Sequence, residues 1–157
     1  FVTTIHVESA QEMYDRVIEL YPKSDVVIKS AAVADYRPIN TYEQKLKKQN
    51  DDLHIEMERT TDILKELGKL KTHQLLVGFA AETNNVEEYA KKKLVTKNLD
   101  LIVANNVTHE GAGFGTDTNI VTIYDRNLES LELPLLSKQE VAKHLLEKVY
   151  VLLKGAR

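Results

Sequence analysis

Short apolar runs alternate with longer polar segments along this 157-residue chain. Three of the runs, at residues 25–31, 74–80 and 100–104, are rich in Val, Ile and Leu. Runs of this length and composition are typical of parallel strands that are covered on both faces. Because the segments between them carry helix signals, the chain predicts an α/β fold with right-handed crossovers. We therefore expect a Rossmann-like, open, mostly parallel sheet with helices on both faces.

Four segments carry the start signals of helices. A Ser, Thr or Asn side chain before a helix can accept a hydrogen bond from one of the first free backbone N–H groups. A Glu three residues after a Ser completes a capping box, which two of the four segments contain. The predicted starts are Ser9 with Glu12, Thr60 or Thr61, Thr83 with Asn84, and Ser137 with Glu140.

The remaining segments predict smaller β elements. Residues 1–7 are expected to form a short strand. Residues 42–50 are basic and residues 53–58 alternate between apolar and polar side chains, so a hairpin-like excursion is predicted there. Residues 119–133 are expected to form an antiparallel pair, and the GAGFG sequence before them is predicted to be a mobile loop or flap.

The composition restricts the class of protein further. The formal net charge of 21 − 24 = −3 argues against a dedicated binder of duplex DNA. The absence of Cys excludes a thiolate nucleophile, an iron–sulfur cluster and a zinc–thiolate site, and it fits a reducing cytoplasm. No apolar run is long enough for a membrane span, and no signal-peptide pattern opens the chain. We predict one cytoplasmic domain over residues 1–157, incomplete at its N-terminus because Phe1 stands directly before a predicted strand.

Polar residues follow the predicted buried strands. Ligands of open α/β sheets bind beyond the carboxyl ends of the strands, so residues 31–38, 79–83 and 105–106 are interpreted as one set. Asp35 could accept hydrogen bonds from a base or ribose, or it could cap amides of its own loop. Arg37 could bind a phosphate or a carboxylate, or it could be solvated.

Two lysine clusters favour an anionic small ligand over a nucleic-acid groove. A polyphosphate would gain charge neutralisation from them, although a soluble surface and i,i+4 helix pairing are the ordinary alternatives. The histidines show no metal-ligand spacing, and Ser30 lacks the sequence of a nucleophile elbow. The clusters are Lys45, Lys47 and Lys48 in a loop, and Lys91, Lys92, Lys93 and Lys97 on a predicted helix.

Five blocks of sequence, KSAAVADYRP, KLKK, TDIL, VGFAAETNN and KNLDLIVANNV, together resemble the bacterial phosphopantothenate-cysteine ligases of coenzyme A biosynthesis. The resemblance implies that CTP activates the carboxylate of 4'-phosphopantothenate, giving an acyl-cytidylate and pyrophosphate, and that the amine of L-cysteine then displaces CMP. It also implies Mg²⁺ and a homodimer. A phosphopantothenoylcysteine decarboxylase, with its FMN, is expected only if that half is fused upstream.

The resemblance assigns roles residue by residue. It makes Lys45 the principal catalytic and phosphate-binding cation and gives Asn105 a role in ordering the site. Thr61 stands where the family more often has Pro. The nucleotide-binding residues that it implies are Ser30, Ala31, Asp35, Lys45, Thr61, Asp62, Ile63, Leu64, Phe79, Lys93 and Lys97.

The family's glycine-rich first strand-loop-helix and an Asn-bearing segment have no counterpart in residues 1–157. We therefore expect these residues alone to lack turnover. Two other readings stay open: a Rossmann-type oxidoreductase or methyltransferase, and a non-catalytic nucleotide-binding module. Eukaryotic relatives use ATP, but the AVADYRP and KLKK blocks resemble the CTP-using bacterial type.

Overall fold

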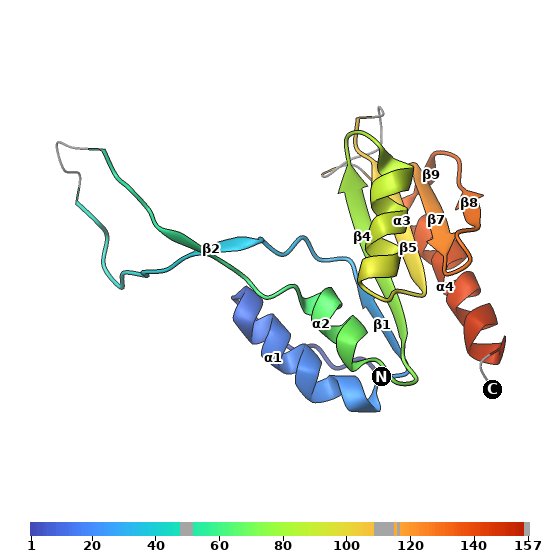
Figure 1. Cartoon of the computed structure of the whole chain (residues 1–157), viewed down its shortest axis with the longest axis horizontal. Helices are drawn as coiled ribbons and strands as arrows, with labels where there is room; N and C mark the ends of the chain where they lie inside the picture. Colours follow the sequence, from blue (N-terminus) through green and yellow to red (C-terminus); the bar gives the residue numbers. More distant parts are fainter. Residues whose placement is uncertain (48–51, 109–114, 116, 156–157) are drawn as a thin grey trace.

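The computed structural model of the chain describes residues 1–47, 52–108, 115 and 117–155. Its centre is a five-stranded sheet with the strand order β1-β4-β5-β7-β8 (Figure 1). Strands β1, β4 and β5 run parallel, and β7 and β8 continue the sheet antiparallel. The predicted α/β fold with an antiparallel extension is confirmed. The bounds are β1 (Val26–Lys29), β4 (Leu75–Glu82), β5 (Leu101–Asn106), β7 (Val121–Asp125) and β8 (Ser130–Glu132).

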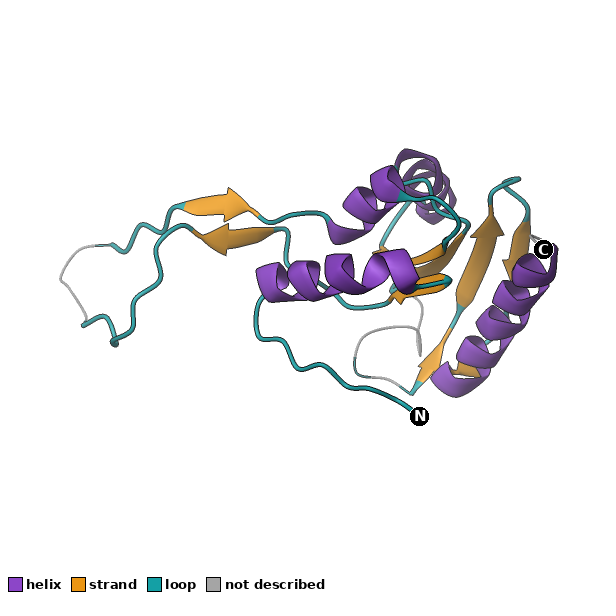
Figure 2. Ribbon diagram, turned by 90° about the horizontal axis from the view of Figure 1, so that it is seen from below, coloured by secondary structure: helices purple, strands orange, loops and turns teal. Residues whose placement is uncertain are grey.

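Helices cover both faces of this sheet. Helices α1 (Ala10–Leu20), α2 (Ile63–Leu70) and α3 (Val86–Thr96) pack on one face, and α4 (Lys138–Gly155) packs on the other (Figure 2). A single 3-10 turn, η1 (Tyr21–Lys23), follows α1. Each face therefore has its own apolar core. No helix among the residues described above is long and apolar enough to cross a membrane.

Alternation along the strands assigns their side chains to the two cores. In β4, Leu76 and Ala80 belong to the core under α1–α3, whereas Val77 belongs to the core under α4. A Cβ on Gly78, between them, would lie 2.8 Å from a methyl group of Leu64 on α2. The glycine therefore lets the Leu64 side chain pack directly on the sheet.

The excursion between β1 and α2 is an arm that leaves the body of the molecule (Figures 1 and 2). Among the described residues of the arm, those paired as strands lie at its base, in the antiparallel strands β2 (Tyr36–Pro38) and β3 (Met57–Arg59). The prediction of a strand over residues 53–58 is therefore wrong except at its last two residues. Its partner, residues 36–38, lies in the polar segment predicted to be a loop after β1. Pro38, which has no N–H to donate, is tolerated there because β2 pairs with β3 alone among the described strands.

The strand expected at residues 1–7 does not form. These residues are extended coil, and all except the half-buried Val7 are exposed. A strand needs a neighbour to accept and donate its backbone hydrogen bonds, and no described segment pairs with residues 1–7. The β-like composition was therefore insufficient without a partner.

The helix starts agree with the predictions at the two capping boxes and differ at the other two. Ser9 and Ser137 cap α1 and α4 by accepting the backbone N–H three residues on. Glu140 accepts the N–H of Ser137 in return, whereas Glu12 accepts the N–H of Glu8. Helix α2 is capped by Asp62 instead of Thr60 or Thr61, because Thr60 is engaged with the Ala34 carbonyl. Helix α3 starts after Asn85, which is left-handed (φ 45°) and makes no side-chain cap bond, so Thr83 and Asn84 are not its cap.

Smaller pieces complete the described chain. Strands β6 (Thr118–Asn119) and β9 (Leu136–Ser137) pair antiparallel beside the start of α4. The hairpin β7–β8 matches the predicted antiparallel pair. The GAGFG sequence lies outside the described residues except for Gly115.

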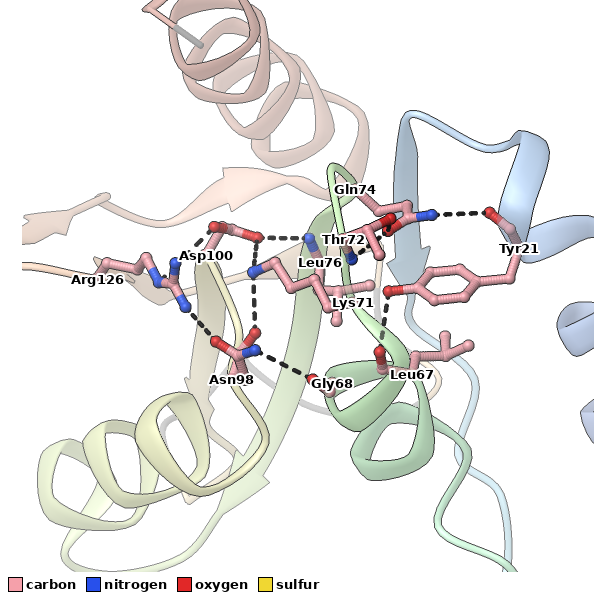
Figure 3. A network of polar contacts seen from close by, with 10 residues as sticks. All are labelled: Tyr21, Leu67, Gly68, Lys71, Thr72, Gln74, Leu76, Asn98, Asp100 and Arg126. Atoms are coloured by element: carbon pink, nitrogen blue, oxygen red, sulfur yellow. Dashed lines mark hydrogen bonds and ion pairs between the residues drawn. The ribbon is translucent and has the colours of Figure 1, made fainter.

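A buried polar network closes the end of the sheet where β4 and β5 begin (Figure 3). Lys71 and Asp100, each with a side chain only 9% exposed, form an ion pair at 2.5 Å. Asp100 also accepts the N–H of Leu76 at 2.8 Å and lies 3.8 Å from Arg126. The loop after α2, the start of β5 and the β7–β8 turn are thereby tied together.

Candidate functional site

The carboxyl ends of β1, β4 and β5 form one edge of the sheet. Glu82 pairs with Asn106, so β4 and β5 end together, and β1 ends beside them with Lys29 opposite Gly78 of β4. Successive side chains of a strand point to opposite faces. The candidate residues are therefore divided between a charged side, toward α2 and α3, and an apolar side, toward α4.

On the charged side, Lys93 of α3 and Lys97 just after it form ion pairs with carboxylates of neighbouring elements. The Lys97 Nζ lies 2.9 Å from Asp62 Oδ2, and the Lys93 Nζ lies 2.6 Å from Glu82 Oε1. Asp62 also accepts the N–H of Lys65 at 3.1 Å, so the same carboxylate caps α2. The edge therefore carries a helix N-terminus with two cations, an arrangement suited to anions.

Close packing of α2 against the end of α3 makes this arrangement possible. A Cβ on Gly68 would lie 2.0 Å from the Lys97 carbonyl oxygen, so only glycine lets the two elements approach. Asn98, in the left-handed conformation, donates its side-chain N–H to the Gly68 carbonyl at 3.0 Å. These contacts hold Lys97 opposite Asp62.

Electrostatics at Asp62 are set by several opposing causes. Partial burial acts to raise its pKa, but the hydrogen bond and charge of Lys97, the N–H of Lys65 and the charge of Lys29 outweigh it. The pKa of Asp62 therefore lies below its usual value. The carboxylate stays ionised and available to its lysine partners.

Lys29 is a member of the charged side that the sequence analysis missed. It ends β1, on the same face as Val27, which packs against the core under α1 and α2. Its Nζ donates to the Ala31 carbonyl at 3.2 Å. Burial and the nearby charge of Lys97 lower its pKa, and Asp62 and Asp35 only partly oppose this. The sequence feature that could have indicated this role is the position of Lys29 directly after three apolar residues, at the end of a predicted strand.

On the apolar side, a cavity of about 630 Å³ lies between the strand ends and α4. Phe79 is 39% exposed there, so it is not simple core packing. The side-chain oxygen of Asn105 is buried and has no hydrogen-bond partner among the described residues. The cavity is lined by Ser30, Ala31, Phe79 and Asn105 from the sheet edge, and by Lys138, Val141, Ala142 and Leu145 from α4, among others.

The structure does not bring Lys45 to either side of this edge. Residues 40–47 are exposed and belong to the arm, which extends away from the sheet (Figure 1). Lys48 lies outside the described residues. Arg37, at the base of the arm, pairs with Glu58 at 2.8 Å. Lys91, for which the sequence left open an ion pair within its helix or a contact with a ligand, forms an ion pair with Glu87.

The TDIL block contributes mainly through its backbone. Ile63 and Leu64 are 2% and 6% exposed and belong to the core, while Thr61 is exposed. Their side chains are therefore not free to contact a ligand, but the first N–H groups of α2 face the end of the helix. Asp35 is exposed, and its backbone carbonyl accepts the Thr60 N–H at 2.9 Å.

No group of three or more Asp, Glu or His side chains among the described residues could hold a metal ion. The two carboxylates of the charged side, Asp62 and Glu82, are both paired with lysine. Magnesium in proteins is often held by substrate phosphates with one or two carboxylates and water. Neither carboxylate is therefore free to ligate a metal ion without giving up its lysine.

The fold and the site place the chain in the class of open α/β domains that carry cations and an apolar cavity at the carboxyl edge of the sheet. The model of the family described as "DNA/pantothenate metabolism flavoprotein C-terminal domain" matches residues 1–152. The chain belongs to this family.

Curated relatives carry the name "Coenzyme A biosynthesis bifunctional protein CoaBC". The one from Bacillus subtilis (strain 168) is 53% identical over 150 residues, which are 96% of this chain and 37% of the relative. The one from Escherichia coli (strain K12) is 40% identical over 153 residues, 95% of this chain and 37% of the relative. The chain thus spans less than half the length of these relatives.

Solved structures agree. The crystal structure of the C-terminal domain of a CoaBC bifunctional protein has a TM-score of 0.81 and 51% sequence identity, and the match covers 98% of this chain and 67% of that one. A flavoprotein from Streptococcus pneumoniae, at 20% identity and a TM-score of 0.73 over 92% of this chain and 71% of that one, shares the fold.

Proposed function

We propose that this domain is the ligase part of a coenzyme A biosynthesis enzyme, which joins 4'-phosphopantothenate to L-cysteine at the expense of CTP. The observation that carries the proposal is the sheet edge, where Lys29, Lys93 and Lys97 lie on one face of the sheet and an apolar cavity lined by Ser30 and Phe79 lies on the other. A triphosphate suits the cationic side. An acid with an uncharged, partly apolar chain suits the cavity, whose buried Asn105 oxygen needs an N–H donor.

In the first step, a carboxylate oxygen of 4'-phosphopantothenate bonds to the α-phosphorus of CTP, and the bond from that phosphorus to the bridging oxygen breaks. Pyrophosphate leaves. In the second step, the cysteine nitrogen bonds to the acyl carbon, loses a proton, and CMP leaves with the bridging oxygen. Because the chain supplies no covalent nucleophile to this sequence, it works by positioning and by neutralising phosphate charge. Mg²⁺ bound to the phosphates adds charge neutralisation.

We also propose that Lys45 binds the α-phosphate of CTP. Because Lys45 lies on the arm, this requires the arm to contact the carboxyl edge of a sheet. Seven large apolar side chains on the arm are exposed, whereas an isolated two-stranded ribbon is marginally stable in water. We propose that a second copy covers the arm in a homodimer. The exposed residues are Tyr36, Ile39, Tyr42, Leu46, Leu53, Ile55 and Met57.

Pyrophosphate release by the full-length protein tests the function. CTP, Mg²⁺ and 4'-phosphopantothenate are supplied with and without cysteine, and Lys45→Gln is compared with Lys47→Gln, an exposed lysine on the same arm. We expect turnover that depends on cysteine, is abolished by Lys45→Gln and is retained by Lys47→Gln. Binding of CTP without pyrophosphate release would instead favour a non-catalytic nucleotide-binding module.

The bifunctional relatives support a further part of the proposal. We expect this domain to work beside a phosphopantothenoylcysteine decarboxylase half, which would bind its own FMN. The decarboxylase would consume the ligase's product. Mass and flavin absorbance of the purified full-length protein test this directly.

A further inference from the structure

The three lysines on the charged side differ in how well their charge is neutralised. Lys93 and Lys97 each have a carboxylate oxygen within 2.9 Å. Lys29 forms no ion pair among the described residues, and its Nζ has the Ala31 carbonyl instead. An arriving anion would therefore gain more at Lys29 than at either of the others.

The surroundings of Lys29 come from three elements. Lys97, at the end of α3, repels its charge, while Asp62, at the cap of α2, and Asp35, in the loop after β1, attract it. Because Asp62 is already bonded to Lys97 at 2.9 Å, it is shared between two cations. Two lysines thus share Asp62, and Asp35 adds a weaker attraction at Lys29.

The Lys29 side chain is also directed toward the residues that line the cavity. Lys29 is half-buried, and it bends back to the carbonyl of Ala31, two residues on. Ser30 and Ala31 line the cavity on the apolar side. Lys29 therefore stands where the charged side and the cavity meet, at the point where phosphates of a ligand that spans both would pass.

We infer that Lys29 is a phosphate-binding residue of the nucleotide site, acting with Lys97 and the N-terminus of α2. The inference rests on the proposed function, since the phosphates are those of CTP. When phosphate oxygens bind, Lys29 exchanges a carbonyl partner for a charged one. Burial and the charge of Lys97 hold the pKa of Lys29 down in the free protein, and a bound phosphate raises it again.

Calorimetric titration of the full-length protein with CTP and with CMP tests this inference. Lys29→Met is expected to weaken CTP binding about tenfold or more. Lys23→Met is the matched control, because Lys23 is exposed and precedes β1 at its opposite end. A loss with CTP alone assigns Lys29 to the β- or γ-phosphate, and a loss with both nucleotides assigns it to the α-phosphate.

Proton uptake separates binding from a merely structural role. Titrations at pH values that approach the usual lysine pKa of about 10.4, each in two buffers of different ionisation enthalpy, should show that CTP binding takes up protons, because the lowered pKa of Lys29 rises when phosphate binds. This uptake should vanish in Lys29→Met. In Lys29→Arg it should also vanish, while most of the affinity returns, since arginine is always charged.

The failures are distinguishable. A wild-type protein that does not bind CTP refutes the proposed function and this inference with it. A wild-type protein that binds CTP, together with Lys29→Met that binds it equally well, refutes this inference alone. Weaker binding in Lys29→Met with unchanged proton uptake also refutes it, because the lysine would then only support the fold.

Discussion

The ion pair between Lys71 and Asp100 offers a sharp test of how the sheet is held. Lys71→Met keeps the length of the side chain and removes its charge. Breaking a buried ion pair by removing one partner costs about 3–5 kcal/mol. Asp100 would keep the N–H of Leu76 at 2.8 Å and Arg126 at 3.8 Å, so we expect the lower end of that range.

Native-state hydrogen exchange measures this locally in the full-length protein. A loss of about 3 kcal/mol should speed the exchange of the Leu76 amide about a hundredfold, provided that this amide exchanges by opening of the sheet. Lys69→Met is the matched control, because Lys69 is 60% exposed and pairs with Glu66 one turn away. Its effect should be about 0.5 kcal/mol or less.

A double mutant completes the design. Lys71→Met with Asp100→Asn should lose less stability than the two single losses added together, because the second change removes a charge that the first left unpaired. Exchange of Leu76 in Lys71→Met within about fivefold of the wild-type rate would refute the reasoning. It would mean that Arg126 and the backbone alone satisfy Asp100.

Three further predictions concern the site. Gly68→Ala should lower the free energy of unfolding, measured by thermal unfolding, by about 3 kcal/mol, because the added Cβ would lie 2.0 Å from the Lys97 carbonyl oxygen. Gly155→Ala is the control, since its Cβ would have no atom within 4 Å, and it should leave the free energy of unfolding unchanged. Because the pKa of Asp62 is lowered in the folded state, the stabilisation from this carboxylate is complete above the unfolded pKa of about 3.9 and is lost as pH falls through the folded pKa. An NMR titration should find a pKa of Asp62 below the unfolded value, and Lys97→Met should raise that pKa. Replacing residues 40–56 by a short Gly-Ser turn should leave the domain folded by circular dichroism, since the arm's strands pair only with each other among the described segments. It should abolish pyrophosphate release and yield a monomer by light scattering, with a melting temperature that no longer depends on protein concentration.

The sequence was informative where structure depends on local chemistry. The three buried strands, both capping boxes and the final hairpin were predicted because each is encoded by adjacent residues. The order of the strands was not predictable, because pairing partners such as Val27 and Leu76 are far apart in the chain. Residues 1–7 show the same limit, since composition does not reveal whether a partner strand is at hand.

The candidate site was predictable to a similar degree. Position after a strand grouped Ala31, Phe79 and Asn105, which line one cavity. Sequence could not separate the two faces of the sheet edge, nor show that Lys45 stands apart on the arm. Lys29 was missed because a single lysine at a strand end is unremarkable until Lys97 and Asp62 are placed beside it.

The arm also bears on how the chain folds. Strand β1 pairs with β4 across a separation of 75 − 26 = 49 residues, whereas β4 pairs with β5 across 101 − 77 = 24. Closing a loop of twice the length adds only about 0.6 kcal/mol of entropic cost. The β4–β5 pair should therefore form before β1 joins it, and the arm can lengthen or shorten at little expense to the sheet. The length of the arm is therefore constrained by the contacts that the arm makes and hardly by the stability of the sheet.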